Sequence, residues 1–420
     1  MDFANHPCFN SEARHRVGRI HLPVARKCNV QCNFCNRKYD CVNESRPGVT
    51  SMVLTPAEAA SYLEAALAKI PNIAVVGIAG PGDPFADPEE TLKTMELVGE
   101  KKPGKILCLA TNGLGILEYV NRVAELNVSH VTITLNAVDP EIGAKIYSWI
   151  RFGTRVYRGA EGAKLLLSRQ TEAIRALKSH GITVKINTVV IPRINDFHVE
   201  EIASYAVELG ADVQNCIPMM HVEDTPFENI TPPSRESVNN LRKIAGGHIA
   251  QMSHCARCRA DAAGLLSGTS DAALVEKLLA EATIVRATPS RPFVAAASME
   301  GLLVNRHLGE ATGVWIFGLE EKGITLKGRR STPPPGLGDT RWERLADTLR
   351  DCAAILVSNC GQTPKRILES KGVRVVAAEG LISEAAGAIL EGRAIPKILM
   401  TRAGNCGAGA SCGGTGGGCG

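Results

Sequence analysis

Six short apolar runs, separated by longer amphipathic stretches, are the feature that most restricts how this chain can fold. The runs lie at residues 19–25, 73–80, 105–113, 131–137, 184–192 and 213–220. They are rich in β-branched residues, end at Gly, Pro or Asn and lack a polar alternate face, which predicts buried parallel strands. Helical patterns lie between them at 55–70, 88–101, 114–127, 162–180 and 198–209. This alternation predicts an α/β domain, a partial (β/α)6 barrel of the TIM type.

A different order of strands and helices follows residue 290. We expect a barrel domain over 1–268 and a linker over 269–290, with a short helical stretch followed by the hinge-like TPSRP. A smaller mixed α/β domain is expected over 291–401. Residues 402–420 are rich in glycine and predict a flexible tail. The three cysteines of the tail leave two interpretations open, transient binding of iron and no function.

The composition excludes several classes of partner. Hydrophobic residues make up 45% of the chain, enough for a sizeable core, whereas 4% aromatic residues and a net charge of +4 argue against a nucleic-acid-binding surface. The N-terminus lacks a signal sequence and no apolar run reaches about eighteen residues, so we expect a cytoplasmic protein without a membrane segment. Cysteines in a reducing cytoplasm predict metal ligands or catalytic groups rather than disulfides.

Three cysteines closely follow the first predicted strand. Cys28, Cys32 and Cys35 form the pattern C-x3-C-x2-C. A structural zinc site usually takes four ligands in paired C-x2-C motifs, whereas three thiolates on one loop suit a four-iron cluster whose fourth iron stays open. The spacing, with Phe34 before the last cysteine, resembles the radical S-adenosylmethionine (SAM) superfamily. That resemblance implies a 4Fe-4S cluster whose open iron binds the amino and carboxylate groups of SAM.

Residues at the carboxyl ends of the predicted strands are candidates for SAM contacts, because ligands bind at that end of parallel barrels. The stretch GIAGPGDP (77–84) resembles the glycine-rich turn of the superfamily, and its glycines permit close approach of the backbone. The plain alternatives are turn formation and capping of strand ends. The candidates are Gly80, Gly82, Asp83, Thr111, Asn112, Asn136, Asn187 and Ile217.

Three cysteine-bearing stretches narrow the resemblance. They are HPC (6–8), GRIHLPVARKCNVQCNFCNRKYDCVNESRPGV (18–49) and HCARCRADAAG (254–264), and together they closely resemble the NifB family of radical SAM enzymes. The resemblance implies that SAM serves twice, as methyl donor to a sulfide and as the source of a 5′-deoxyadenosyl radical. It implies fusion of two 4Fe-4S clusters, with a SAM-derived carbide and an added sulfur, into an eight-iron precursor of the nitrogenase cofactor (NifB-co).

The same resemblance implies ligands for the two clusters that serve as substrates. It assigns Cys8, His21 and Cys108 to one cluster and Cys41, Cys255 and Cys258 to the other. Cys41 is expected to face away from the SAM cysteines. Without the resemblance, Cys108 reads as a core thiol and His21 as a core histidine.

Glu44 and Arg46, on the loop after Cys41, are the predicted catalytic residues. A carboxylate on the cluster loop suits proton handling or SAM contact, and a solvated turn is the alternative. In the second domain, GLLVNRHLGEATGVWIF (301–317) resembles the NifX and NafY family of cofactor carriers. That resemblance assigns cofactor binding to His307 and implies that the domain holds or hands on the product.

The resemblance also implies protein partners. These are an electron donor such as a ferredoxin or flavodoxin, iron–sulfur cluster donors, and carrier or scaffold proteins of nitrogenase assembly. Two rival functions remain, another radical SAM enzyme with auxiliary clusters and a carrier of clusters without catalysis. Cys8 and Cys41 on either side of the SAM triplet disfavour the first rival, and the intact triplet disfavours the second.

Overall fold

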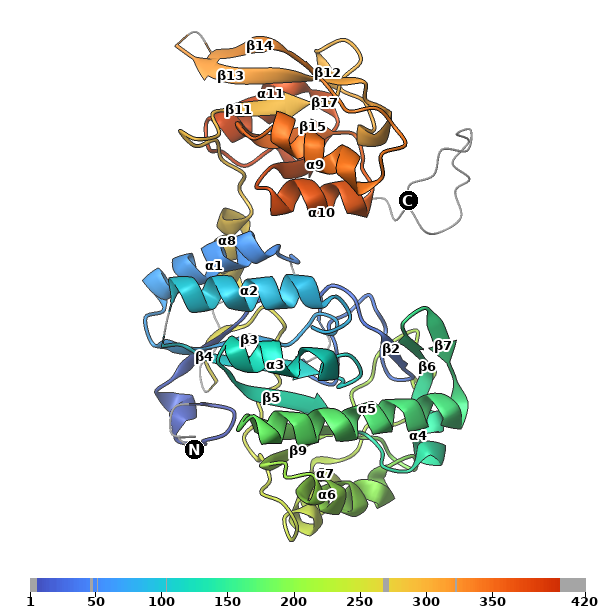
Figure 1. Cartoon of the computed structure of the whole chain (residues 1–420). Helices are drawn as coiled ribbons and strands as arrows, with labels where there is room; N and C mark the ends of the chain where they lie inside the picture. The colour runs from blue at the N-terminus through green and yellow to red at the C-terminus, as the bar shows by residue number, and fades with distance from the viewer. Residues whose placement is uncertain are drawn as a thin grey trace. The chain divides into compact units, whose positions relative to one another are not determined.

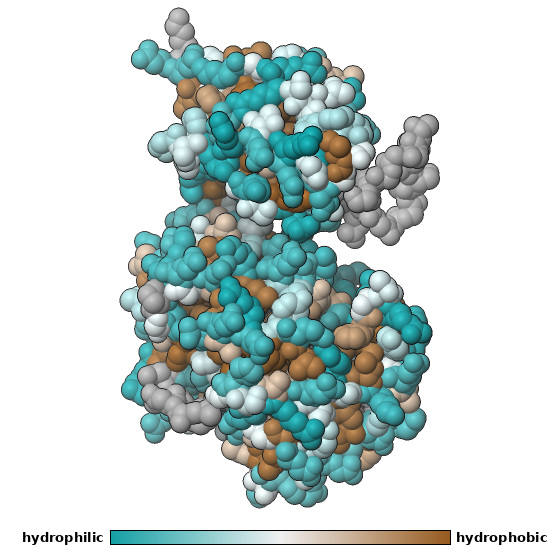
Figure 2. All heavy atoms as spheres, viewed as in Figure 1, coloured by the Kyte–Doolittle hydropathy of each residue, from teal (hydrophilic) through white to brown (hydrophobic). Residues whose placement is uncertain are grey.

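The computed structural model describes residues 6–45, 48–50, 52–102, 104–266, 272–321 and 323–400. It divides into two compact units, Met1–Ala282 and Thr283–Gly420, whose elements are labelled in Figure 1. Within the described residues, no helix is long and apolar enough to cross a membrane. Figure 2 shows that the visible face of each unit is mostly polar, with small apolar patches between the polar residues.

A seven-stranded sheet with the order β10-β1-β3-β4-β5-β8-β9 is the frame of the first unit. The strands from β1 to β9 in that order are parallel, and β10 pairs antiparallel with β1 at the edge. The bounds are β1 Gly18–His21, β3 Ile73–Ile78, β4 Ile106–Thr111, β5 Val128–Thr134, β8 Thr183–Val190, β9 Val213–Pro218 and β10 Ala263–Leu265. Each predicted run holds a parallel strand, so the predicted α/β partial barrel is confirmed, with β10 as an unpredicted addition.

Helices follow the strands where the sequence predicts them. They are α1 Pro56–Lys69, α2 Pro88–Lys101, α3 Val120–Glu125, α5 Gly159–Ser179 and α6 Val199–Glu208. A capping box starts α1, since the Thr55 side chain accepts from the Glu58 amide while the Glu58 carboxylate accepts from the Thr55 amide. The sequence did not predict α4 Pro140–Ile146 and α7 Arg235–Ala245. The first of these is too short to show a helical period.

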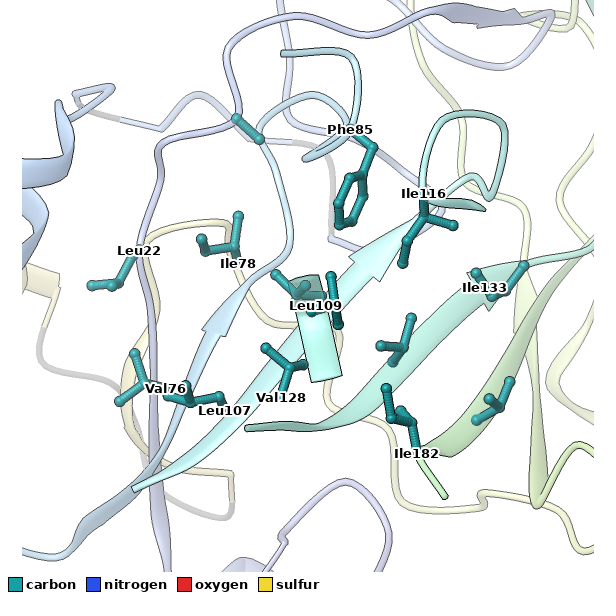
Figure 3. Close-up of a cluster of buried hydrophobic side chains, with 14 of the residues drawn as sticks. Leu22, Val76, Ile78, Phe85, Leu107, Leu109, Ile116, Val128, Ile133 and Ile182 are labelled. Carbon is teal, nitrogen blue, oxygen red and sulfur yellow. The ribbon is translucent and has the colours of Figure 1, made fainter. Parts of the chain in front are cut away.

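The two faces of the sheet differ in chemistry because side chains alternate along each strand. One face packs under the helices, and Figure 3 shows Leu22, Val76, Ile78, Leu107, Leu109 and Ile133 in that core. The expectation that the strands lack a polar face is wrong. The alternating positions carry Arg19, His21, Cys108, Thr132, Thr134, Lys185 and Asn187. Of these, Arg19, His21, Thr134 and Asn187 bond to residues of the loops inside the barrel.

A small antiparallel sheet supports the cysteine loop. It consists of β2 Val30–Cys32, β6 Tyr147–Phe152 and β7 Arg155–Tyr157. Because β2 pairs with β6, Cys32 lies opposite Tyr147, after a shift of register between Gln31 and Cys32.

The region expected to be a linker contains the helix α8 Ala272–Ala282. Its residues Val275, Leu278 and Leu279 are buried in the core of the first unit. The first unit therefore extends through this helix, and the second begins at Thr283.

The second unit is a mixed sheet with the order β14-β13-β11-β15-β16, covered on both faces. Its elements are β11 Phe293–Ala296, β12 Leu303–Val304, β13 Gly313–Glu320, β14 Gly323–Ser331, α9 Asp339–Thr348, β15 Cys352–Val357, α10 Gln362–Ser370, β16 Arg374–Ala377, β17 Gly380–Leu381 and α11 Ile382–Leu390. Residues of α9 and α10 share one core cluster with the sheet, and residues of α11 share another. The predicted smaller mixed α/β domain is confirmed.

Candidate active site

The cysteine triplet lies on the loop that follows β1 and passes through β2. Cys32 is buried, and Cys28 and Cys35 are partly buried. Side-chain amides donate to two of the sulfurs. Asn112 Nδ2 lies 3.7 Å from Cys28 Sγ, and Asn43 Nδ2 lies 3.7 Å from Cys32 Sγ. Donors of this kind stabilise thiolates and tune iron–sulfur clusters bound to them.

The glycine-rich turn is fastened to the chain just before the triplet. The Gly82 amide donates to the Ala25 carbonyl at 2.5 Å, and the Asp83 amide donates to the Lys27 carbonyl at 2.7 Å. A Cβ on Gly82 would overlap that Lys27 carbonyl, so only glycine permits the approach. Gly80 has a φ of +124°, which also favours glycine. The turn thus lies beside the cysteine loop, where the resemblance expects the SAM-binding turn.

Asp83 is buried and joins this turn to the end of β4. Its carboxylate accepts from Thr111 Oγ1 at 2.9 Å, from the Asn112 amide at 2.6 Å and from the Phe85 amide at 2.9 Å. Burial raises the pKa of Asp83, and these donors oppose the rise. Asp83 and Thr111 therefore bond to each other and position the turn.

Two further predicted strand-end residues, Asn136 and Asn187, bond to Asn43, which the sequence did not single out. Asn136 Nδ2 donates to Asn43 Oδ1 at 3.1 Å, and Asn187 Nδ2 donates to the Asn43 carbonyl at 3.1 Å. Ile217 is buried in β9 and adds an apolar side chain. No motif marks Asn43, because its role depends on contacts between distant strands.

Cys41 lies beside the SAM cysteines. Asn43 Nδ2 is 3.6 Å from Cys41 Sγ and 3.7 Å from Cys32 Sγ, so one amide reaches both sulfurs. The expectation that Cys41 faces away from the triplet is therefore wrong. The loop turns back because the Cys41 amide donates to the Pro81 carbonyl at 2.9 Å, which holds it against the glycine-rich turn. Its assignment to a substrate cluster stays a prediction.

Glu44 reaches the polar inner face of the barrel. Its Oε1 accepts from Thr134 Oγ1 at 2.7 Å, and its Oε2 accepts from Asn187 Nδ2 at 2.9 Å. Burial raises the pKa of Glu44 to about 7, against the lowering effect of both donors. The carboxyl is thus held at two atoms inside the barrel, and Thr134 is a further residue of the site. Arg46, the other predicted catalytic residue, lies outside the described residues.

Four cysteines form a second group. They are Cys8, Cys108, and the neighbouring pair Cys255 and Cys258. Burial raises the pKa of Cys8 to about 11, and the thiols of Cys258 and Cys255 contribute to the rise. Burial raises the pKa of Cys108 to about 12, with a contribution from Cys8. His254 Nε2 donates to the Pro7 carbonyl at 2.9 Å, which ties the segments of Cys255 and Cys8 together. The two predicted ligand sets both draw on this group, and their partition stays a prediction.

His21 has one ring nitrogen bonded to the backbone, and its role as a ligand stays a prediction. Its Nδ1 donates to the Arg259 carbonyl at 3.0 Å, which leaves Nε2 as the acceptor nitrogen. The register aligns His21 with Gly77 on β3 and Gly77 with Cys108 on β4. Gly77 leaves room for the ring, since a Cβ there would lie 3.3 Å from His21 Cδ2. Burial lowers the pKa of His21 to about 4, so the ring is neutral, the form that binds metals.

Two buried cations, neither among the predicted site residues, join the second cysteine group. Arg19 donates to Cys258 Sγ from Nε at 3.3 Å and from Nη2 at 3.0 Å. Lys185 is 8% exposed, and its Nζ lies 5.7 Å from the centre of the Phe9 ring. Burial lowers the pKa of Lys185, but acidic neighbours outweigh burial and leave the pKa above its ordinary value. Those neighbours are Cys8, Cys255, Glu44 and Cys108.

His307 lies in the second unit, at the start of the 3-10 turn Leu308–Glu310. Its Nδ1 accepts from the Gly309 amide at 3.1 Å, and its backbone forms a bridge with Asn359. The cofactor-binding role of His307 stays a prediction.

The donor set of the triplet fits a four-iron cluster. Three sulfurs on one loop, two of them bonded by amides, can each bind one iron and leave the fourth iron open to SAM, next to the glycine-rich turn. Across the described ranges, no three His, Cys, Asp or Glu side chains are arranged to hold a single metal ion.

Fold and site together define a radical SAM enzyme, with a SAM-binding 4Fe-4S cluster and SAM as its cofactors. A model of the Radical SAM superfamily matches residues 22–206, and a model described as Dinitrogenase iron-molybdenum cofactor matches residues 291–392. FeMo cofactor biosynthesis protein NifB of Chlorobaculum tepidum is 49% identical over 423 residues, which cover 100% of this chain and 99% of that protein. The protein of the same name from Bradyrhizobium diazoefficiens is 38% identical over 89% of this chain and 83% of its own length. The chain therefore belongs to the NifB family.

Proposed function

We propose that the protein fuses two 4Fe-4S clusters, with insertion of a SAM-derived carbide and an added sulfur, into the eight-iron precursor of the nitrogenase iron–molybdenum cofactor. The observation that carries this proposal is the second cysteine group. Four thiols from three segments, together with His21, gather on the inner face of the barrel that Glu44 also reaches. A radical SAM enzyme without further clusters has no need for such a set of iron ligands.

The protein's own residues have distinct parts in this function. Cys28, Cys32 and Cys35 would hold the SAM-binding cluster, which with SAM supplies a 5′-deoxyadenosyl radical, while a further SAM supplies a methyl group. Glu44, held by Thr134 and Asn187, is the carboxyl positioned to take a proton from the methyl-derived carbon.

The ligands and cations of the inner face suit anionic substrates that must later leave. A neutral histidine such as His21 adds no charge to a cluster, so it binds less firmly than a thiolate. Arg19 and Lys185 supply positive charge without a permanent bond to iron. Their burial is otherwise costly, which supports an anionic occupant.

The second unit is proposed to hold or hand on the product, with His307 as its ligand. Its match to the Dinitrogenase iron-molybdenum cofactor model supports this role. Membership of the NifB family also supports partners in nitrogenase assembly, namely cluster donors, carrier or scaffold proteins, and an electron donor such as a ferredoxin or flavodoxin.

The proposal is tested by anaerobic reconstitution, iron counting, and addition of SAM with a reductant. We expect about twelve irons per chain, in three clusters of four, and formation of both 5′-deoxyadenosine and S-adenosylhomocysteine. Deoxyadenosine without S-adenosylhomocysteine would support another radical SAM enzyme, and neither product would support a carrier. Cys28→Ala should abolish both products.

A further inference from the structure

Two side chains on the cysteine loop bind the backbone carbonyls of the loop itself. Gln31 Nε2 donates to the Cys35 carbonyl at 2.7 Å and to the Cys32 carbonyl at 3.1 Å. The Arg37 guanidinium donates through Nη2 to the Val30 carbonyl at 2.9 Å and to the Cys28 carbonyl at 3.2 Å.

The two side chains are also bonded to each other. Arg37 Nε donates to Gln31 Oε1 at 3.3 Å. Through this bond, one connected set of donors, the Gln31–Arg37 clamp, reaches the carbonyls of all three SAM-cluster cysteines. The fork of a guanidinium suits this geometry, since it presents several N–H groups in one plane.

The clamp also brings a positive charge to the triplet. Arg37 forms no ion pair with a carboxylate among those found in the described part of the chain. Its strongest acidic neighbours are thiols, those of Cys28, Cys35, Cys41 and Cys32. The outer side of Arg37 is exposed, so dissolved salt screens part of its charge.

We propose that the Gln31–Arg37 clamp is a positioning device that fixes the cysteine loop and raises the reduction potential of the SAM-binding cluster. One-electron reduction adds a negative charge to the cluster, and a fixed cation beside its ligands favours the reduced state. The clamp therefore makes the electron transfer that precedes SAM cleavage easier. This inference rests on the radical SAM assignment and not on the identity of the product.

The test is a redox titration of the anaerobically reconstituted full-length protein, followed by electron paramagnetic resonance. The signal that changes on addition of SAM reports the SAM-binding cluster. We expect Arg37→Gln to shift its midpoint potential to a more negative value, with the shift shrinking as salt is added. Arg37→Lys should keep most of the wild-type potential, because it keeps the charge.

Lys38→Gln is the matched control. Lys38 is the next residue, but it points to solvent and pairs with Asp224, with both side chains 72% exposed. We expect no shift in this variant. If Arg37→Gln fails to retain a cluster, Gln31→Glu is compared with Gln31→Met. Both variants lose the Nε2 bonds to the Cys32 and Cys35 carbonyls, but only the carboxylate neutralises Arg37, so Gln31→Glu should have the more negative potential.

The charge role is overturned if the loaded Arg37→Gln protein keeps the wild-type potential, or if Gln31→Glu keeps the potential of Gln31→Met. It is equally overturned if Arg37→Lys shifts as far as Arg37→Gln. A loss of iron without any change in potential would leave a purely structural clamp and contradict the proposal as stated.

Discussion

The hydroxyl of Thr134, on β5, donates to the carboxylate of Glu44 at 2.7 Å and so fixes the carboxyl inside the barrel. Glu44 follows the cysteine loop, whereas Thr134 belongs to the sheet, so this bond joins the loop to the frame. We predict that Thr134→Val lowers kcat for formation of the eight-iron product about ten-fold, the effect of losing one hydrogen bond to a charged group.

The cluster spectrum of that variant should stay normal, because Thr134 contacts none of the SAM cysteines in the hydrogen bonds found here. Glu44→Gln keeps the size of the side chain and removes the proton-accepting oxygen, so it should lose more activity than Thr134→Val. Equal activity of wild type and Glu44→Gln would refute the catalytic role.

Lys185 provides a second prediction, because its ammonium is buried among acidic groups. Lys185→Met should lower the iron bound after reconstitution from about twelve to about eight atoms, since the cluster next to it loses its compensating charge. Lys185→Arg should bind nearly the wild-type amount. Lys69→Met, at an exposed site in the last turn of α1, is the control and should bind the full amount. Full iron loading of Lys185→Met would contradict the prediction.

Gly82 provides a third prediction, on stability. Gly82→Ala places a methyl group against the Lys27 carbonyl, which cannot move without displacing the cysteine loop. We expect a loss of about 2–4 kcal/mol in the free energy of unfolding and poor cluster loading. Gly99→Ala, inside α2 with no atom within 4 Å of the added Cβ, should instead stabilise the protein by about 0.5–1 kcal/mol. Denaturant unfolding of both variants decides the comparison.

A fourth prediction concerns pH and the second unit. Arg330 donates to the Asp351 carboxylate, and these hydrogen bonds lower the pKa of Asp351 below its ordinary value of 3.8. Because the folded pKa is the lower one, the stabilisation is present above the unfolded pKa and is lost as the pH falls through the folded pKa. Asp351→Asn should cost about 1 kcal/mol or less at pH 7, since the pair is partly exposed.

Hydrogen exchange of β15, which begins at Cys352, measures this effect in the full-length protein. Wild type and Asp351→Asn should differ at pH 7 and converge as the pH falls through the folded pKa, which lies below 3.8. A difference that persists unchanged at low pH would show that the ion pair is not its cause.

The strands of the barrel could be predicted because their outward residues form continuous apolar patterns. The polar inner face could not, since each inward residue is a single polar position within an apolar run. Lys185, for example, stands between Val184 and Ile186 and reads as an interruption. The electrostatic role of Lys185 depends on Cys8 and Cys255, which are distant in sequence and lie near it in the fold.

At the candidate site, too, local motifs could be predicted from the sequence and contacts between distant residues could not. The cysteine triplet and the glycine-rich turn could be singled out from local motifs, and the structure places the two side by side. The position of Cys41 could not, since a hydrogen bond to Pro81 decides which way its loop turns. Asn43 was missed for the same reason, because its amide bonds to sulfurs and to Asn136 only once the barrel has formed.

We propose that the cluster held by Cys28, Cys32 and Cys35 serves to cleave SAM, whereas the second cysteine group holds the iron–sulfur substrates. The most direct test compares wild type with a variant in which Cys8, Cys108, Cys255 and Cys258 are all changed to Ala, for both products of SAM after anaerobic reconstitution. We predict that this variant still forms 5′-deoxyadenosine, because the triplet is intact, but forms little or no S-adenosylhomocysteine, because neither substrate cluster keeps its thiolates. S-adenosylhomocysteine at the wild-type yield in this variant would contradict the account.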